Sequence, residues 1–363
     1  MADATASTTP ALTEAPMDPE ALASHINGRI DQLHVDTVSD DPFTWTPTAQ
    51  YACGKTVLAD VAALLRNYRH VSKAGTVTMI LVFGVVLPLL LALGAWQLQI
   101  PSDEEVRFWT FIGLGIIALI STIVACVIGT PATVDLDIGL AWYCITRGWG
   151  FSRLHQEDVW DRYQKRFDYF DCGDEDQEVR LRIWGKTDDG RPFQLFEFYY
   201  ETVTYVPVTT KVGNSTVTTM RKVETPHHRY GIFLTVPESK VRFRISEVGG
   251  GFGKRVELES GAFNDAVGVY CDPADEAAVV KFLSPAVILA MQEFFANLDG
   301  VILDFYPGML LVGTHHDFLG DGSVTLDEHA PQFEVKLTHF GDGIERFRSF
   351  VDAAVNTFRK YND

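Results

Sequence analysis

Two long runs without a charged residue dominate the hydrophobic pattern of the chain. They cover residues 76–98, TVTMILVFGVVLPLLLALGAWQL, and residues 108–128, FWTFIGLGIIALISTIVACVI. About 20 apolar residues are enough for a helix to cross a bilayer core, and core helices of soluble proteins are usually shorter and less uniformly apolar. The connecting PSDEEVR is too short to hold a domain. The pattern therefore predicts a transmembrane hairpin over residues 74–130.

Basic residues near the ends of the runs set the expected orientation. Lys55, Arg66, Arg69 and Lys73 precede the first run, whereas the connection has Arg107 beside three acids. Because Lys and Arg are enriched on the cytoplasmic side, we expect a multi-pass protein of the plasma membrane with both termini cytoplasmic. Neither run carries an ionisable side chain, the usual mark of an ion path, so transport is not expected.

Small residues recur at a spacing of four in the second run. They are Ala118, Ser121, Thr122 and Ala125. Small side chains allow membrane helices to approach closely. This stripe would either pack the hairpin on itself or join two copies in a homo-oligomer.

The residues before the runs divide into two parts. Residues 1–17 are poor in aliphatic side chains and rich in Ala, Thr, Pro and acids, which predicts a disordered tail. Residues 18–73 hold two amphipathic patterns with helical spacing, over Pro19–His34 and about Lys55–Arg69. We expect cytoplasmic helices here, and the second one either contacts the lipid surface or packs on the cytoplasmic domain.

Residues 131–363 change to the period-two alternation that is typical of strands. EVRLRIWGK alternates apolar residues with arginines and predicts a half-buried strand, and FQLFEFYYETVTYVPV, HHRYGIFLTVP and KVRFRISE predict further strands. Helical spacing returns after Asp272 and again over Ile344–Lys360. The expected fold class is α+β, a cytoplasmic domain with a mainly antiparallel sheet packed on a C-terminal helix.

A Thr-rich segment over residues 208–225 interrupts this pattern. Gly213-Asn214 is a hairpin turn signal between two arms that are mostly polar on both faces. Such a hairpin should protrude from the sheet. It is either an arm that grasps a partner or a tolerated surface insertion.

Composition excludes several classes of function. The net charge of −18 supplies no dense basic face, so nucleic-acid binding is not expected. The five cysteines are widely spaced without a C-x-x-C pair, as in reduced intracellular proteins. GGGFGKR, residues 249–255, lacks the first glycine and the Ser or Thr of a phosphate-binding loop, and a strand rather than a helix is expected after it.

Two segments are candidates for a metal. His227-His228 and His315-His316 are adjacent pairs, which cannot chelate within one strand but could converge if their strands meet. Asp317 or His329 would complete a zinc site. Residues 317–328 also resemble a calcium loop, with Asp317, Asp321 and Glu328 at ligand positions but Leu319 where an oxygen is required.

Short ordered motifs between Arg147 and Val312 resemble an uncharacterised bacterial family, that of domain of unknown function 3137. They are Leu258-Glu259, Phe263-Asn264, the strand Val267–Cys271 and Leu283-Ser284-Pro285, with RGWGFS and GRPFQLFEFYY upstream. The two spans ahead of them are typical of its actinobacterial branch. The resemblance implies membrane anchoring, a cytoplasmic α+β domain and LemA-type membrane proteins as partners. It implies no reaction and no catalytic residues.

Two hypotheses follow for the function. The first is a membrane-anchored interaction or scaffold module that binds a protein or a lipid headgroup at the inner face of the membrane. The alternative is a membrane-tethered metal-dependent enzyme that uses the histidine pairs or the loop Asp317–Glu328. The sequence has no local signature of serine, cysteine or metalloprotease catalysis, so an enzyme is the less expected of the two.

Overall fold

The computed structural model describes most of the chain in two compact units. The described residues are 19–37, 39–67, 74–98, 103–129, 134–136, 138–154, 157–212, 215–247, 252–295, 300–319, 324–326 and 341–362. The expectations for residues 1–17, for Gly213-Asn214 and for Asp321, Glu328 and His329 lie outside them. One unit comprises residues 1–27, 59–136 and 324–335, and the other comprises residues 28–58, 137–323 and 336–363.

The N-terminal helices α1 (Pro19–Ile30) and α3 (Gly54–Asn67) each bury one aliphatic stripe. In α1 the stripe is Leu22, Ala23, Ile26 and Ile30, and in α3 it is Leu58, Val61, Ala62 and Leu65. The spacing of three and four residues places each set on a single side of its helix. Both amphipathic patterns in the sequence therefore correspond to helices, although α1 ends four residues before the expected His34.

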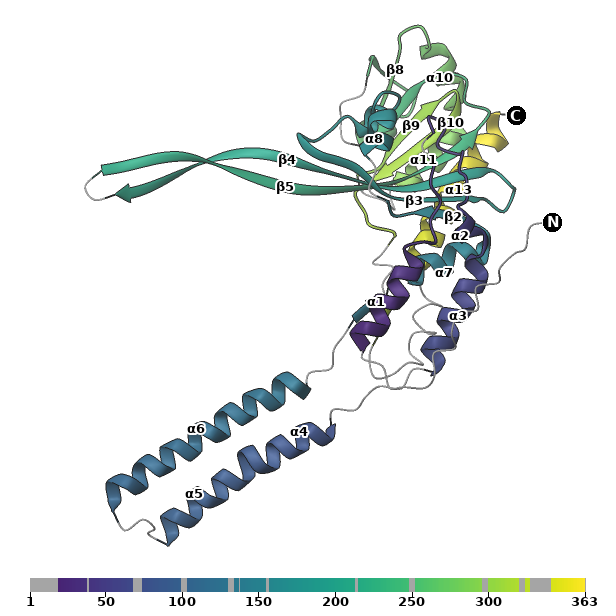
Figure 1. Cartoon of the computed structure of the whole chain (residues 1–363). Coiled ribbons are helices and arrows are strands. Elements are labelled where there is room, and N and C mark those ends of the chain that lie inside the picture. Colours follow the sequence, from purple (N-terminus) through teal and green to yellow (C-terminus); the bar gives the residue numbers. More distant parts are fainter. Residues whose placement is uncertain are drawn as a thin grey trace, which may run out of the picture. The chain divides into compact units, whose positions relative to one another are not determined.

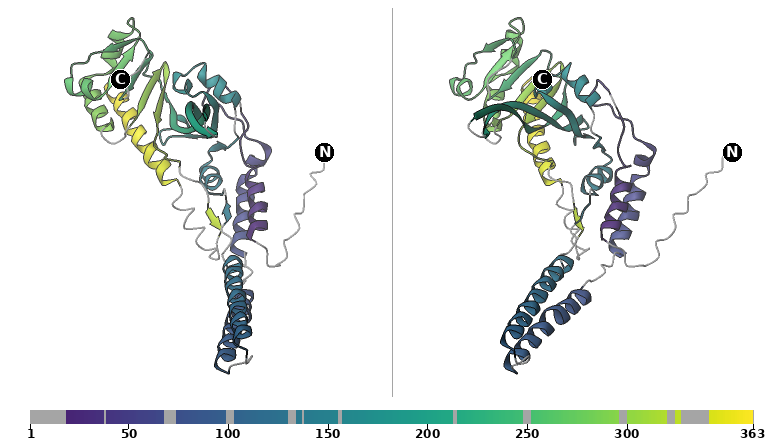
Figure 2. Two further views of the ribbon diagram at one scale, coloured as in Figure 1. Left: turned by 90° about the vertical axis from the view of Figure 1, so that its left-hand side faces the viewer. Right: turned by 60° about the vertical axis from the view of Figure 1, so that its left-hand side comes forward.

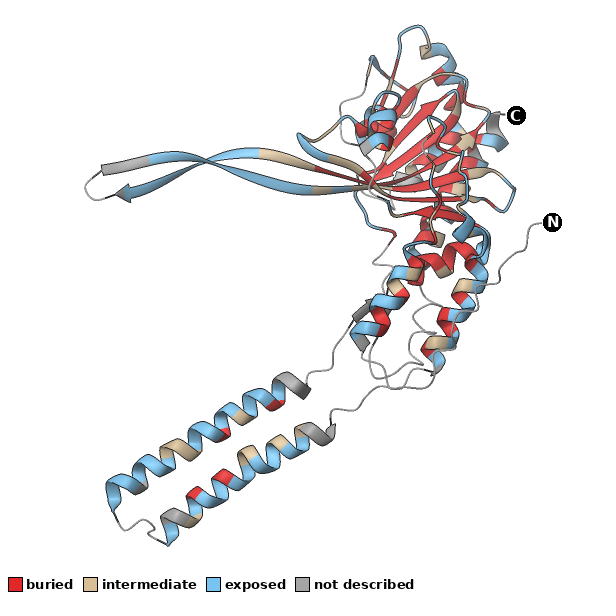
Figure 3. Ribbon diagram, in the orientation of Figure 1, coloured by how far each residue is buried: buried red, intermediate tan, exposed pale blue. Residues whose placement is uncertain are grey.

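Two helical segments are long and apolar enough to cross a membrane. The first runs through α4 (Ala74–Leu81), the π-helical turn η1 (Val82–Val86) and α5 (Leu87–Gln97), and the second is α6 (Glu104–Gly129). The most apolar stretch of each is only 11% buried, whereas the core helix of a soluble protein is mostly buried (Figure 3). The π-helical turn ends two residues before Pro88, which has no N–H to continue the α-helical ladder.

Small residues bring these two helical segments into contact. A Cβ atom at Gly84 would overlap the side chain of Ser121 in α6, so only glycine permits this approach. Ala92, Ala118 and Ala125 are buried, while the larger aliphatic side chains of the same helices are exposed. Of the two roles expected for the small residues, packing of the hairpin on itself is the one observed. The same unit holds a short antiparallel pair, β1 (Val134–Leu136) with β11 (Val324–Leu326).

The other unit is built on a nine-stranded antiparallel sheet in the order β2-β3-β4-β5-β10-β9-β6-β8-β7 (Figure 1). The strands are β2 (Gly150–Ser152), β3 (Glu175–Lys186), β4 (Pro192–Val212), β5 (Ser215–Val236), β6 (Phe243–Ser246), β7 (Lys254–Val256), β8 (Gly268–Cys271), β9 (Ile302–Tyr306) and β10 (Gly308–Thr314). The helices are α2 (Ala49–Ala52), α7 (Ile138–Arg147), α8 (Glu157–Gln164), η2 (Asp168–Phe170), α9 (Gly261–Ala266), α10 (Glu276–Phe282), α11 (Pro285–Phe295) and α13 (Asp342–Asn362). This mixture of helices with an antiparallel sheet agrees with the expected α+β class.

Helices lie on both faces of this sheet (Figure 2), and aromatic side chains pack between them and the strands. On one face, α8 and η2 supply Tyr163 and Phe170, which pack on Phe196 and Phe233 of the central strands. On the other face, Phe305 of β9 contacts Phe282 of α10 and Phe358 of α13 at centroid distances of 5.4 and 5.2 Å. The C-terminal helix thus packs on the sheet through the apolar stripe expected over Ile344–Lys360.

Several expected elements differ from the structure. The second arm of the Thr-rich hairpin and the strand HHRYGIFLTV form one continuous strand, β5, because their pairing with β4 is never interrupted. Strand β3 is buried on both faces, not half-buried. The Arg182 guanidinium donates to the carbonyl of Thr37 and the Trp184 indole to that of Pro42, so an upstream segment covers the face expected to be solvated.

The start of the helix after Asp272 also differs from the expected position. The helix expected directly after Asp272 begins only at Glu276, because the Asp272 carboxylate accepts from the Ala274 N–H in a turn. In the following helix α11, Val287 and Met291 are fully buried, whereas Leu289 is 69% exposed. Of the strand VELES expected after the glycine-rich segment, only Val256 is in a strand, since β7 covers Lys254–Val256; residues 249–251 lie outside the described part.

Replacement of Phe170 by alanine tests the aromatic layer. The ring is fully buried and contacts the rings of Phe196, Phe198 and Phe233, so its loss should lower the free energy of unfolding by about 3–5 kcal/mol. Urea unfolding of the full chain in detergent measures this value. Tyr205→Ala, at a side chain 59% exposed, is the matched control and should change it by less than about 0.5 kcal/mol. Equal effects of the two variants would contradict this packing.

Candidate functional site

The most distinctive surface of the sheet unit is a two-stranded arm formed by residues 202–225. Strands β4 and β5 pair in unbroken register from Phe193↔Leu234 to Val212↔Ser215. The neighbouring strands stop earlier, since pairing of β3 ends at Glu175↔Glu201 and pairing of β10 ends at Thr314↔Tyr230. The arm therefore leaves the sheet as an isolated, twisted ribbon (Figure 1). At about 3.3 Å per residue its strands extend roughly 35 Å.

Alternation along the strands gives the arm two faces of different chemistry. The Tyr205 face consists of Val203, Tyr205, Pro207, Thr209 and Lys211 opposite Thr216, Thr218, Met220, Lys222 and Glu224. The Val206 face consists of Thr202, Thr204, Val206, Val208 and Thr210 opposite Val217, Thr219, Arg221, Val223 and Thr225. The expectation of two mostly polar faces is thus only partly met, because each face has an apolar centre.

Large apolar side chains on the arm are open to solvent (Figure 3). Tyr205 and Met220 are 59% and 61% exposed, and Val206, Val208 and Val223 are also exposed. Water contact of this apolar surface costs about 25 cal/mol per Å² relative to burial. Contiguous exposed apolar surface of this kind is typical of a site for another molecule.

The edges of the arm are less suited to binding than its faces. A free strand edge exposes unpaired N–H and C=O groups that attract further strands. Pro207 in β4 and Pro226 in β5 remove an N–H from each strand, and Lys211 and Arg221 add charge. Prolines and charges on edges oppose strand addition. The arm should therefore bind through its side-chain faces.

Four rings at the base of the arm, Tyr199, Tyr200, His227 and His228, form a collar that fixes its direction. Tyr200 stacks on His227 at a centroid distance of 5.0 Å, and Tyr199 meets His228 edge-on at 5.1 Å. The Arg180 guanidinium lies 3.3 Å from the centre of the Tyr199 ring. These contacts hold the arm where it loses its neighbouring strands.

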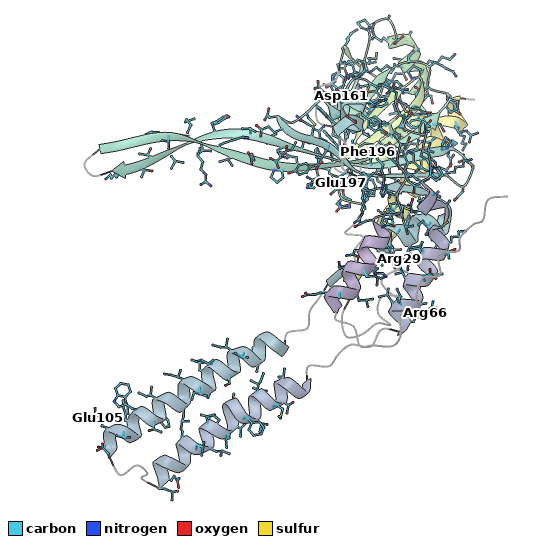
Figure 4. The ribbon with its side chains drawn as sticks, in the orientation of Figure 1. Arg29, Arg66, Glu105, Asp161, Phe196 and Glu197 are labelled. Carbon is cyan, nitrogen blue, oxygen red and sulfur yellow. The ribbon has the colours of Figure 1, made fainter. Side chains whose placement is uncertain are left out.

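Polar contacts reinforce the collar. His228 Nδ1 lies 2.8 Å from a carboxylate oxygen of Glu197, which is labelled at the base of the arm in Figure 4, and His227 Nε2 lies 2.9 Å from the Thr202 hydroxyl. Asp174 accepts from the Val203 N–H, and Lys222 forms ion pairs with Glu175 and Glu224. The base of the arm is thus held by more side-chain contacts than we would expect for a surface insertion without a function.

The arm differs in charge from the rest of the chain. Residues 202–225 contain three bases, Lys211, Arg221 and Lys222, against the single acid Glu224, within a chain of net charge −18. In contrast, an acidic run from Asp171 to Glu178 leads into β3 at the base of the arm. Lys211 lies near the tip of the ribbon, whereas Arg221 and Lys222 are the register partners of Val206 and Tyr205, closer to the acidic base.

The structure places His315 of the second histidine pair beside the first pair, while His316 is exposed. Pairing of β5 with β10 ends at Thr314↔Tyr230, so His315 follows directly beside the collar, close to His227 and His228. His227 and His228 already have Thr202 and Glu197 as partners. Among the residues that the structure describes, no group of three or more His, Cys, Asp and Glu side chains is arranged to hold a metal ion.

The remaining metal candidates divide between described and undescribed residues. His316 and Asp317 are exposed, and the Asp317 carboxylate accepts from the Leu319 N–H in a local turn. Asp321 and Glu328, and the alternative zinc ligand His329, belong to the stretch outside the description. The proposed zinc and calcium sites therefore stay predictions.

A buried ion pair in the sheet was not anticipated. Arg244 of β6 and Asp304 of β9 are register partners and form an ion pair, and the Tyr306 hydroxyl donates to the same carboxylate at 3.3 Å. Burial raises the pKa of Asp304 even though Arg244 opposes the shift. Asp304 lies within the apolar run VILDFY, and an acid in such a run is the only signal the sequence offers. Because Asp304 is fully buried, we assign this pair to the fold and not to a binding site.

Comparison with known proteins adds no relative: no family model matches the chain, and no curated protein or solved structure is significantly similar to it. The resemblance to the family of domain of unknown function 3137 therefore stays an expectation drawn from the short motifs. Function must be inferred from the geometry of the chain itself.

The arrangement of charges beside the collar can be tested through the pKa of His315. Partial burial lowers the pKa of His315 below its ordinary value of 6.5, and the positive charge of Arg229 lowers it further. The folded state thus favours the neutral ring, so its contribution to stability falls as the pH drops through 6.5 towards the folded-state pKa. NMR titration of the full chain, assigned with His315→Gln, should show this low pKa. Arg229→Gln should raise it, whereas Arg180→Gln should not, and an unshifted pKa would contradict the arrangement.

Proposed function

We propose that this chain is a membrane-anchored interaction module, and that its arm binds a partner molecule. The observation that carries the proposal is the arm itself. A ribbon of about 35 Å with exposed Tyr205 and Met220 stands on a base constrained by stacked rings and ion pairs. The central strands of the same sheet bury Phe196, Phe198 and Phe233 fully, so the apolar side chains of β4 and β5 become exposed only where these strands leave the sheet.

Membrane anchoring is supported by the two long apolar helical segments and their low burial. We propose that both cross the plasma membrane as a hairpin, with both termini in the cytoplasm. Lys55 and Arg66 lie ahead of the first span, and the acids Asp103, Glu104 and Glu105 lie between the spans, which supports this orientation. The sheet unit would then face the cytoplasm and meet its partner at the inner face of the membrane.

Tethering matters for a binding surface of this size. A membrane restricts both molecules to a thin layer and so raises their effective concentration, as linking two modules does. A modest contact made by a thin ribbon would then be populated without the large interface that a soluble complex requires. The membrane anchor and the arm would thus both contribute to binding of the partner.

Photo-crosslinking in native membranes tests the proposal. p-Benzoylphenylalanine at position 205 should yield a discrete covalent adduct, because this position lies in the centre of the Tyr205 face. The same residue at position 289, where Leu289 is 69% exposed on α11, is the matched control and should yield none. Equal adducts from both positions, or none from either, would contradict an arm that binds a partner.

A further inference from the structure

We propose that the partner of the arm is the arm of a second copy of this chain. The two arms would pack antiparallel, with their Tyr205 faces against each other. The inference rests on the proposed function, because it takes the arm to be the binding element and names what it binds. Three properties of the Tyr205 face support it: its apolar centre, its charge distribution and its symmetry.

The apolar centre lies midway along the arm. Pro207 is the register partner of Met220, and Tyr205 lies one step closer to the base on the same face. Among the arm side chains that the structure describes, Tyr205 and Met220 are the most exposed apolar ones, at 59% and 61%. A central apolar patch within a polar rim is the arrangement found in protein interfaces. An antiparallel partner would cover this patch with the same residues from the second copy.

The charges of the Tyr205 face change sign along its length. Near the base, Glu201 and Glu224 lie on this face, and Lys222 pairs with Glu224 and with Glu175 of β3. Towards the tip the face carries Lys211, which forms no ion pair with another described residue. Two arms packed antiparallel place the tip of each over the acidic base of the other. Two arms packed parallel would oppose like charges.

The register makes this contact self-complementary. If a two-fold axis passes at the pair Pro207 and Met220, Tyr205 of one copy lies opposite Thr209 of the other. The same axis places Lys211 of one copy opposite Val203 of the other, and the cross-strand partner of Val203 is Glu224. A two-fold interface uses one surface patch twice and closes after two copies, so it does not lead to open fibres. Each dimer would thus contain two equivalent pairs of Lys211 with Glu224.

The size of the face predicts a weak contact that depends on tethering. From Val203 to Lys211 the face is roughly 30 Å long, and two strands are about 10 Å wide, so each copy offers a footprint of about 300 Å². Stable soluble complexes bury about 800 Å² per partner. The dimer should therefore form in the membrane, where the local concentration is high, and dissociate on dilution in detergent.

Cysteine crosslinking of the full chain in membranes tests this arrangement. The exposed Cys53 and Cys126 are first replaced by serine, and two differently tagged copies are then produced together, one with Tyr205→Cys and one with Thr209→Cys. Mild oxidation should link the two tags, because these positions face each other. Either variant alone should link poorly, since two copies of the same position lie about 13 Å apart, beyond the reach of a disulfide.

The opposite face provides the matched control. The control pair is Val206→Cys in one copy and Val208→Cys in the other. These positions are also exposed and lie one residue on either side of position 207, but they belong to the Val206 face and should not link. Lys211→Glu should lower the yield of the 205–209 dimer about fivefold, as expected for two lost surface ion pairs that become repulsive. Addition of Glu224→Lys to the same chain should restore the yield.

The outcomes separate this inference from the proposed function. Absence of the 205–209 dimer while benzoylphenylalanine at position 205 still links to another protein or to lipid would overturn the arm dimer and leave the interaction module intact. Equal linking through the Val206 face would overturn the assignment of the face. Absence of every adduct at position 205 would contradict both.

Discussion

The poor solubility of uncharged helices in water is the constraint on which this account depends. The segments α4–α5 and α6 have most of their aliphatic side chains exposed, and their mutual contact uses small residues such as Gly84 and Ala118. Exposed Leu, Ile, Phe and Val side chains favour lipid over water by about 0.3–0.6 kcal/mol each at the centre of a span. We therefore propose that lipid covers them, and the anchor then sets the conditions under which a thin arm can bind.

The arm depends on the continuity of β4 and β5. Both strands begin in the aromatic core around Phe196 and Phe233 and continue without a register break into the exposed ribbon. The core therefore determines which side chains of the arm share a face. The collar of Tyr199, Tyr200, His227 and His228 stabilises the point at which neighbouring strands end, since stacked rings there replace the lost strand contacts.

Local patterns predicted much of the fold but not its long-range partners. Charge-free runs, period-two strands and the stripe around Phe347 and Phe358 are properties of short windows, and each corresponds to an observed element. The burial of Arg182 could not be predicted, because the carbonyl that receives its hydrogen bond belongs to Thr37, far away in the sequence. The Arg244–Asp304 pair was missed for the same reason. Of the candidate site, composition predicted a protruding hairpin, whereas the collar depends on which strands stop pairing.

Alkaline carbonate extraction of membranes tests the central claim most directly. Carbonate releases proteins that are held by surface contacts but not those with helices in the bilayer core. The account predicts that the full chain stays in the membrane pellet, and that arginines at Leu119 and Ile120 of α6 weaken this retention because each costs about 2.5–3.5 kcal/mol at the centre of a span. Quantitative release of the unaltered chain into the supernatant would contradict it.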